Sequence, residues 1–358
     1  MNKKVMVAMS GAVESSVAAA LIYDRGYDIC GVTLKFFGDE DLGLYGNNAN
    51  CFLEDVREAK NLASNMEFNH YVFNFGMSFH TEVITRFTQG YINGNTPNPC
   101  IDCKRYITFE KLFDRAMLMG FDYIATGHYA RVVFDEDKNR YLLKRAKDKS
   151  KDQSYLLYFM SQKKLAKSLF PLGDLMESEV HRLAQEKYTV NTNRTDGIEL
   201  CFVRGGNVSE FLENSMGMHS REGLFIDKNG KVLGTHKGIV HYTIGQRKGI
   251  GLSFATPQYV IHKDVMNNTI TLGEKSDLFS QSLIADDLNF IAISELSKPM
   301  RVSAQTRFRE AESPATISPI GKGRVKVTFD TPQKAVTAGQ AVVFYDNDIV
   351  VGGGTIIE

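Results

Sequence analysis

Two of the five cysteines form a Cys-x-x-Cys pair in a segment that contains prolines. Cys100 and Cys103 belong to the stretch Thr96-Pro97-Asn98-Pro99-Cys100-Ile101-Asp102-Cys103, which Lys104 and Arg105 follow. Such a pair suits half of a zinc site or a redox dithiol, although no second ligand pair with suitable spacing exists. The prolines predict instead a rigid loop that presents the thiols, and the two basic residues favour the thiolate form.

A third cysteine, Cys201, lies in the stretch Gly197-Ile198-Glu199-Leu200-Cys201-Phe202. A lone cysteine in such an apolar setting is usually part of the core. The count of five is odd and residues 1–4 do not begin a secretion signal, so we expect a cytosolic chain without a disulfide scaffold. If the thiols have a function, they act as reactive groups or as metal ligands.

A second candidate site is the turn Ser10-Gly11-Ala12-Val13-Glu14-Ser15-Ser16, which joins a predicted strand to a predicted helix. Backbone N–H groups at the start of a helix, together with the helix dipole, can hold a phosphate. The hydroxyls of Ser10, Ser15 and Ser16 add donors. The turn is not a Walker A loop, because it lacks the Gly-Lys-Ser/Thr ending. A tight strand-to-helix turn with a serine cap is the alternative interpretation.

Strand and helix patterns alternate around this turn in the first third of the chain. The predicted strands are Lys4–Met9, Ile29–Lys35, His70–Phe75 and Asp122–Ala125, and the predicted helices are Ser15–Arg25, Glu54–Met66 and Phe109–Met119. Such alternation predicts a parallel sheet with helices on both faces. Ligands bind these sheets at the carboxyl ends of strands, so Ser10, the end of the second strand and Thr126-Gly127-His128 should meet.

Short β-like segments with glycine turns replace this pattern after Gly206. They are Gly223–Ile226, Lys231–Leu233, Ile239–Ile244, Gln258–His262 and Thr269–Gly273, and the chain is almost entirely β-like from Phe279 to Ile357. An earlier hairpin is predicted over Val132–Lys144. We therefore expect an α/β domain at 1–205, a small β-rich central domain at 206–276 and a C-terminal β-barrel at 277–358.

The formal charges balance, with 42 basic and 42 acidic residues. This argues against a nucleic-acid binder that works by bulk charge, although local basic patches remain. Most of these patches are expected to be solvated surface. They comprise Lys144–Lys151, Arg247-Lys248, Arg301–Arg309 and Lys322–Lys326. The longest apolar runs are too short for a membrane span, so no membrane partner is expected.

The Ser10–Ser16 turn resembles the pyrophosphate loop (PP-loop) of the ATP pyrophosphatase superfamily, whose pattern is Ser-Gly-Gly-x-Asp-Ser. Members of that superfamily split ATP between the α and β phosphates and adenylate an oxygen of the substrate. Ala12 stands at the second glycine, where its Cβ would crowd the phosphate or disfavour a positive φ. Glu14 stands at the aspartate and keeps its charge.

Ordered matches along nearly the whole chain resemble the bacterial tRNA-specific 2-thiouridylases. They comprise Asn98-Pro99 with Cys103, Thr126–Arg131, Lys151–Tyr155, Phe170–Gly173, Cys201-Phe202, Thr243–Arg247, Ala335-Val336, Gly339–Ala341 and Gly352–Gly354. The resemblance implies a PP-loop domain, a central domain and a barrel that contacts tRNA. It also implies an enzyme that uses ATP and Mg²⁺ to replace the C2 oxygen of the wobble uridine with sulfur.

Position by position, the resemblance assigns roles to individual residues. Cys103 would be the nucleophile and Cys201 the persulfide carrier, and the two would form a transient disulfide. The expected ATP-binding residues are Ala8, Met9, Ser10, Gly11, Ala12, Val13, Glu14, Ser15, Leu34 and Gly127. The expected contacts with the target base are Asn98, Pro99 and Cys100, and Cys100 stands where the family often has an aspartate as general base. The other expected tRNA contacts are His128, Lys151, Asp152, Gln153, Thr306, Arg307 and Gln340.

The resemblance also implies partners. These are tRNAs for lysine, glutamate and glutamine, and a cysteine desulfurase or sulfur-relay protein that supplies sulfur. Two other classes stay open: a tRNA- or nucleotide-binding paralogue with altered catalysis, and another adenylating enzyme with this loop, similar to argininosuccinate synthase. The presence of both Cys103 and Cys201 favours the thiouridylase.

Overall fold

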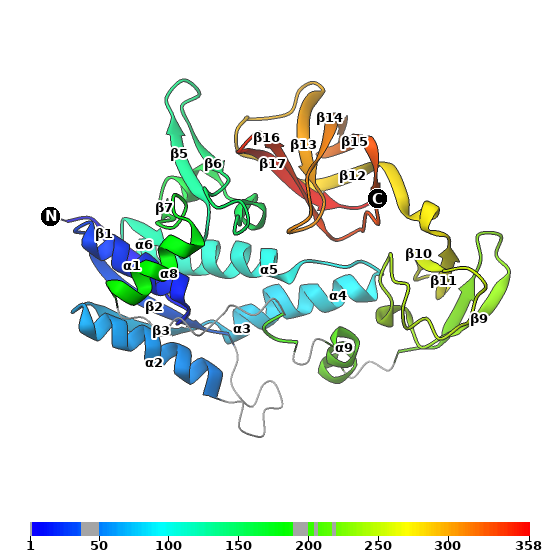
Figure 1. Cartoon of the computed structure of the whole chain (residues 1–358), viewed down its shortest axis with the longest axis horizontal. Coiled ribbons are helices and arrows are strands. Elements are labelled where there is room, and N and C mark those ends of the chain that lie inside the picture. The colour runs from blue at the N-terminus through cyan, green and yellow to red at the C-terminus, as the bar shows by residue number, and fades with distance from the viewer. Residues whose placement is uncertain (1, 37–49, 189–199, 204–206, 217–219) are drawn as a thin grey trace.

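The computed structural model describes residues 2–36, 50–188, 200–203, 207–216 and 220–358. It contains a parallel sheet with helices, a small central β domain and a C-terminal barrel (Figure 1). The fold class predicted from the sequence is therefore confirmed.

The first sheet has five parallel strands in the order β3-β2-β1-β4-β7. Its strands are β1 (Lys4–Ala8), β2 (Asp28–Lys35), β3 (Asn69–Asn74), β4 (Tyr123–Ala125) and β7 (Ser168–Leu169). The apolar run Val5, Met6 and Val7 is completely buried, which suits the centre of a parallel sheet. Because β1 pairs with β2 on one side and β4 on the other, the strand order reverses at β1.

Alternate residues of β1 pack against helices on opposite faces of this sheet. Val5 and Val7 share a cluster with α1 (Val13–Asp24) and α2 (Asn50–Asn65). Met6 points to the other face and packs with Phe109 and Phe113. α8 (Glu177–Glu186) covers the outer side of α1, where Val180 and Ala184 meet Val17.

The helix across the Met6 face is longer than the sequence predicted. Its parts α5 (Pro99–Asp102), η2 (Cys103–Leu112, π-helical) and α6 (Phe113–Leu118) follow one another without a break. The predicted helix Phe109–Met119 is only its second half. The sequence prediction also missed the helical run α3 (Gly76–Phe79), η1 (His80–Thr85) and α4 (Arg86–Ile92), together with α8 and α9 (Val208–Met216). Short elements complete this part: η3 (Ser154–Leu157) and α7 (Gln162–Leu165).

The central domain is a four-stranded sheet in the order β10-β11-β8-β9. Its strands are β8 (Gly223–Ile226), β9 (Val232–His236), β10 (Tyr259–Asp264) and β11 (Thr269–Gly273). The strand predicted at Ile239–Ile244 was wrong, because η5 (Ile239–His241) is a 3₁₀ turn. Gly238, with φ +124°, ends the extended chain, and Ile239 and Tyr242 then both face the same core.

The C-terminal domain closes into a barrel of six strands, joined to the central domain through η6 (Lys275–Leu278). The strands are β12 (Phe279–Phe290), β13 (Met300–Gln305), β14 (Ser313–Gly321), β15 (Arg324–Lys334), β16 (Ala341–Asp346) and β17 (Ile349–Ile356). Pairing of β12 with β17 closes the ring, which removes the open edges. The predicted hairpin is present as β5 (Arg131–Asp135) and β6 (Arg140–Lys144), and Lys144 pairs with Ile349 to extend the barrel sheet.

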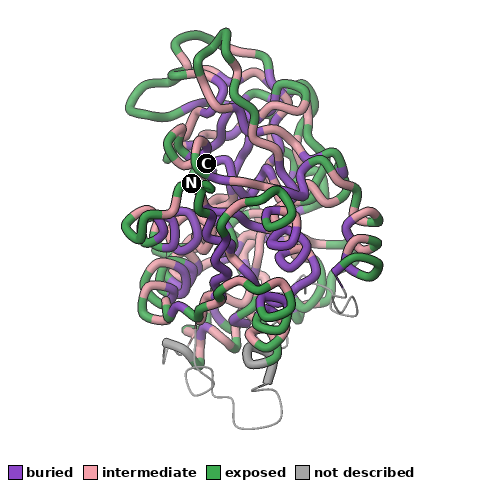
Figure 2. Tube along the Cα trace, turned by 90° about the vertical axis from the view of Figure 1, so that its left-hand side faces the viewer, coloured by how far each residue is buried: buried purple, intermediate pink, exposed green. Residues whose placement is uncertain are grey.

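The α/β domain and the barrel share a hydrophobic core. Met6 of β1, Tyr158 and Tyr345 of β16 belong to one buried cluster. In Figure 2 the buried stretches run through the middle of the molecule, and the exposed stretches lie on outer helices and loops. The two domains therefore form one packed unit.

Arg145 joins these two domains by charge and by stacking. Its guanidinium lies 3.6 Å from the centre of the Tyr345 ring and pairs with Asp152 at 3.4 Å and with Glu312. The Asp152 side chain is only 5% exposed, and Arg145 supplies its counter-charge beside hydrogen bonds from Ala146 and Ser154.

We predict that Arg145→Ala lowers the free energy of unfolding by about 3 kcal/mol, because it leaves Asp152 buried and unpaired. Lys147→Ala is the matched control, since its ion pair with Glu179 is half exposed and should contribute less than about 1 kcal/mol. Urea denaturation of both variants measures the difference. Equal losses would show that the domain contact does not depend on Arg145.

Candidate functional site

The Ser10–Ser16 turn is held in shape by the hydroxyl of Ser15. This hydroxyl accepts a hydrogen bond from the Ser10 backbone N–H at 3.0 Å and donates one to the Ala12 carbonyl, also at 3.0 Å. Gly11 has φ +80°, and a Cβ there would lie 2.5 Å from Cα of Asp55. Glycine is therefore required at Gly11 by both its backbone angle and its contact with α2.

Ala12 is not strained, contrary to what the sequence suggested. Its backbone is extended, with φ −76° and ψ 160°, so a Cβ carries no conformational cost. It is the N-cap of α1, and its methyl side chain makes no capping hydrogen bond. A phosphate at this position can accept hydrogen bonds from N–H groups of the first helical turn.

Three segments meet at this helix end, as the sequence predicted. The Met9 N–H donates to the Val32 carbonyl of β2 at 2.8 Å. Gly127, after β4, lies so close that a Cβ would stand 2.8 Å from the Ser15 nitrogen. Leu34, at the end of β2, is partly buried between two cores. The site sits at the reversal of strand order, where α/β sheets bind nucleotides.

Glu14 of the turn joins a second group of possible ligands from α8. Glu14, Glu177 and His181 each offer one ligand atom, and these atoms all lie within 4.8 Å of one another. Glu177 also pairs with Lys151. Carboxylate oxygens are the donors that Mg²⁺ prefers, and the two glutamates fit that ion beside the phosphate-binding turn.

The two cysteines of the Cys-x-x-Cys pair lie in the first turns of a helix and not in the loop that the sequence predicted. The Asn98 side chain accepts a hydrogen bond from the Cys100 N–H at 3.1 Å, and Pro99 occupies the first helical position. Asn followed by Pro is a helix-start signal, so this feature was readable from the sequence.

A turn of the barrel fixes the segment just before this helix. The Thr96 N–H donates to the Ala338 carbonyl at 2.9 Å, and the Gln340 side chain donates to the Thr96 carbonyl at 2.6 Å. A Cβ on Gly339 would stand 3.1 Å from the Thr96 nitrogen. The barrel therefore sets where the cysteine helix begins.

Cys103 and Cys201 approach each other across one hydrophobic cluster. Cys103 packs against this cluster, which contains Phe202 and Val203, and it interacts electrostatically with Cys201 and Cys100. Cys30, Cys100, Cys103 and Cys201 are all free thiols. The Cys103–Cys201 disulfide is thus not formed in this state. Cys51 lies outside the residues whose side chains are described.

Burial keeps the two thiols protonated, which corrects the prediction of a thiolate. Burial raises the pKa of Cys103 to about 12, and Lys104 opposes this only partly. Cys201 has an exposed surface, but its thiol lies mostly among protein atoms, and burial raises its pKa to about 11. Neighbouring cations do not outweigh the loss of water around these groups.

Several predicted tRNA contacts have partners within the protein. The Asp152 carboxylate accepts from the Ala146 N–H, and the Gln153 side chain accepts from the Tyr129 N–H. His128 bonds Thr126 at 2.7 Å, and burial lowers its pKa well below the ordinary value. Arg307 pairs with Glu310 at 3.2 Å. These residues, with Thr306, stay predictions as RNA contacts.

A salt bridge near the cysteines escaped the sequence reasoning. Arg105 makes a two-point contact with Asp287 of β12. Asp102 lies in the same network, and burial raises its pKa to about 6 despite Arg86 and Arg105. No local pattern could reveal it, since its partners are almost two hundred residues apart in sequence.

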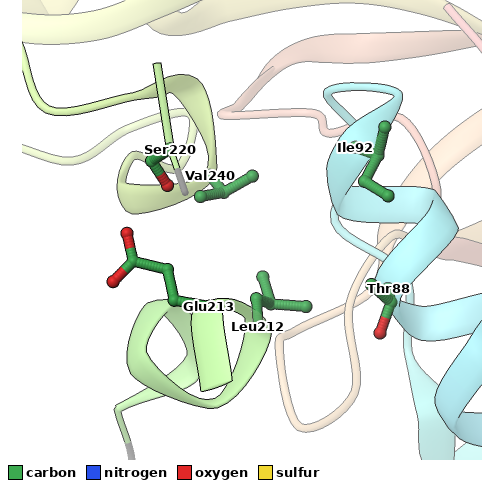
Figure 3. Close-up of a pocket in the computed structure, with 6 residues that line it drawn as sticks. All are labelled: Thr88, Ile92, Leu212, Glu213, Ser220 and Val240. Atoms are coloured by element: carbon green, nitrogen blue, oxygen red, sulfur yellow. The ribbon is translucent and has the colours of Figure 1, made fainter. Parts of the chain in front are cut away.

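One small cavity lies beside this region, between α4, α9 and the central domain (Figure 3). It is lined by Thr88, Ile92, Leu212, Glu213, Ser220 and Val240. Its volume of about 10 Å³ suits a single water molecule. It cannot hold a nucleotide.

Comparison with known proteins decides the family. A model described as tRNA methyl transferase HUP domain matches residues 3–205, the PRC-barrel domain of the same name matches 209–274, and an aminomethyltransferase β-barrel domain matches 280–356. The chain is 45% identical to tRNA-specific 2-thiouridylase MnmA of Acetivibrio thermocellus over 99% of both chains. It is also 45% identical to that of Clostridioides difficile, over 99% of this chain and 98% of the relative.

The chain belongs to the tRNA-specific 2-thiouridylase family.

Membership in the 2-thiouridylase family agrees with the site. The match to a HUP domain implies that the chain uses ATP. Among solved structures, NMN synthetase from Francisella tularensis covers 61% of this chain and 73% of its own at 17% identity, and its TM-score of 0.34 is too low to establish the fold. No helix in the described ranges is long and apolar enough to cross a membrane.

We predict that Gly11→Ala lowers ATP affinity at least about tenfold, because a Cβ would push the turn away from α2. Gly26→Ala is the control: Gly26 has a similar φ of +78° and open space around it, so only the backbone cost of about 1 kcal/mol applies. Isothermal titration with ATP and thermal unfolding separate the effects. Unchanged ATP affinity in Gly11→Ala would remove the turn from the binding site.

We also predict that alkylation of Cys103 and Cys201 accelerates about tenfold per pH unit from about pH 7 to about pH 10, because only the thiolate reacts and both pKa values lie above this window. Mass spectrometry resolves each site, and the exposed Cys100 is the internal reference for reagent access. A plateau below about pH 9 would contradict protonated resting thiols.

Proposed function

We propose that the chain is an ATP-dependent tRNA 2-thiouridylase that replaces the C2 oxygen of the wobble uridine with sulfur. The observation that carries this proposal is the pair Cys103 and Cys201: Cys103 packs on the cluster that contains Phe202, and the two thiols are close enough to interact electrostatically. Full-length similarity to proteins described as tRNA-specific 2-thiouridylases supports the same activity. The chain would then have one binding site for ATP, one for the target base and one residue that carries the transferable sulfur.

The chemistry requires activation first, because the C2 oxygen of uracil is a very poor leaving group. The oxygen attacks the α-phosphorus of ATP and releases pyrophosphate, so that AMP becomes the leaving group. The terminal sulfur of a Cys201 persulfide then attacks C2, and AMP departs. The Cys103 thiolate attacks Sγ of Cys201, which leaves sulfur on the base and a Cys103–Cys201 disulfide that a thiol reductant must reduce. In a second route, Cys103 releases hydrosulfide first, and hydrosulfide attacks C2.

Residues around the helix start would hold the base. Asn98, Pro99 and Cys100 form the first turn next to Cys103, and Cys100 is exposed. The uridine must leave its stack to reach this turn. Since Cys100 has no carboxylate, the general base of the reaction must be another group.

Ions and partners complete the proposal. Mg²⁺ neutralises phosphate charge when bound, and Glu14 and Glu177 are the residues that would hold it. Sulfur would come from a cysteine desulfurase or a sulfur-relay protein that reaches Cys201 at the surface. An enzyme that modifies tRNA with ATP would act in the cytoplasm, on tRNAs for lysine, glutamate and glutamine.

We predict that Cys201→Ser reduces thiolation of tRNA to background, because a hydroxyl cannot carry transferable sulfur. ATP and tRNA binding should persist, since serine is nearly isosteric. Cys103→Ser should also stop turnover, but it should still accept sulfur at Cys201 and then stall. Mass spectrometry of the protein and of digested tRNA reports both steps.

Cys100→Ser is the matched control within the same turn. It should keep most activity if Cys100 only lines the base pocket. Full thiolation by Cys201→Ser would reject the persulfide assignment. Wild-type protein that binds ATP and tRNA but never thiolates would instead indicate the paralogue with altered catalysis.

A further inference from the structure

The central domain carries an open, polar hollow far along the chain from the cysteines. Its volume is about 210 Å³. It is lined by Arg247, Gly249, Ile250, Gly251, Leu252, Phe254, Thr256, Pro257 and Gln258. All of these residues belong to the loop Arg247–Gln258, so this loop alone forms the walls of the hollow.

Gln246 anchors the start of this loop. Its side chain accepts from the Thr243 N–H at 3.0 Å and donates to the Lys248 carbonyl at 3.0 Å. Its backbone accepts from the Val260 N–H at the other end of the loop. The side chains of Ile250 and Leu252 add an apolar anchor, because both pack with the domain core. These hydrogen bonds and apolar contacts therefore hold the loop in one position on the domain.

The backbone of the loop offers unused donors. Gly249 and Gly251 have φ +77° and +81°, a conformation that turns successive N–H groups toward one side. No backbone N–H from Arg247 to Gln258 donates a hydrogen bond to any residue in the described part of the chain. Concave runs of free N–H groups bind anions.

The charged side chains of the loop likewise form no ion pair with the described residues. Arg247 and Lys248 are exposed and form no ion pair with a described residue. In contrast, Arg145, Arg301 and Arg307 of the other basic patches are paired with carboxylates. Phe254 is 37% exposed at the same hollow and presents a ring on which a base can stack. Cations, free N–H groups and an aromatic ring together suit a nucleotide of an RNA chain.

The chain approaches itself closely at two places between the hollow and the cysteine region. A Cβ added to Gly245, next to Gln246, would lie 3.2 Å from Cβ of Ala335, which follows β15 of the barrel. A Cβ added to Gly94, two residues before Thr96, would lie 2.8 Å from Cγ2 of Val265 in the central domain. The loop Arg247–Gln258 would thus keep a constant position relative to Cys103, and an RNA that reaches Cys103 would pass near it.

We propose that the hollow formed by Arg247–Gln258 binds a backbone phosphate of the tRNA, with Arg247 and Lys248 as counter-charges and Phe254 against an adjacent base. This rests on the proposed function for the identity of the RNA. The hollow contributes RNA affinity and takes no part in sulfur chemistry.

The first test measures tRNA affinity as a function of salt with the full chain. Arg247→Ala/Lys248→Ala should weaken binding about tenfold and make the slope of log affinity against log salt shallower by about two. The charge-preserving variant Arg247→Lys/Lys248→Arg should bind nearly as wild type. Lys231→Ala, an exposed lysine of the same domain outside the hollow, is the control for general charge. An unchanged slope in the double alanine variant would overturn the proposal.

A second variant pair tests the backbone of the loop. Gly251→Ala and Gly230→Ala carry the same strain, because both glycines have φ above +80° and open space around the added Cβ. Only Gly251→Ala should reduce tRNA affinity. Equal effects of the two would assign the loss to strain and contradict the N–H contact.

Two further measurements separate the possible sources of phosphate and the proposed function. Competition by inorganic phosphate, with tRNA affinity unaltered in the double alanine variant, would assign the hollow to free phosphate and overturn the RNA contact. Thiolation should be as fast in the control Lys231→Ala as in wild type. If wild type binds tRNA with the expected salt slope but never thiolates, the proposed function fails while the RNA contact stands.

Discussion

The fold of the reactive region depends on one contact between distant parts of the chain. The Thr96 N–H donates to the Ala338 carbonyl and the Thr96 carbonyl accepts from the Gln340 side chain, and a Cβ at Gly339 would press against the Thr96 nitrogen. Because the cysteine helix starts three residues later, its position is set by a barrel turn some 240 residues further along the chain. A catalytic domain cut off before the barrel would lose this constraint. The barrel therefore helps to position the helix that carries Cys100 and Cys103.

The same packing explains why the thiols rest in their protonated form. Cys103 lies against Phe202 and Ile107, and loss of water raises its pKa more than Lys104 lowers it. A protonated thiol is a weak nucleophile, so both thiols react slowly while this packing is intact.

The sequence revealed the features that depend on local pattern and missed those that depend on distant partners. Strand and helix periodicity predicted the parallel sheet, the hairpin and the barrel, and the meeting of Ser10, β2 and Gly127 followed from the sheet rule. The Asn98-Pro99 helix start was visible but was interpreted as a loop. The hydrogen bond from Gln340 to Thr96 and the Arg105–Asp287 salt bridge could not be predicted, because each joins residues more than 180 positions apart. The thiolate prediction was wrong because a sequence shows which residues beside a cysteine are charged but does not show how deeply its thiol is buried.

Charge pairing also decides which basic residues can serve an RNA partner. In the described part of the chain, 12 of the 42 lysines and arginines form an ion pair with a carboxylate, and RNA must compete for those. Lys151 and Glu177 are each about one-third exposed, so their pair contributes little and can be exchanged for a phosphate at small cost. Arg145 cannot make this exchange, since the nearly buried Asp152 would lose its counter-charge. Neighbouring basic residues in one patch thus divide into those that hold the domains together and those that remain able to change partner. Burial of the anion, and not the number of positive charges, determines to which group each residue belongs.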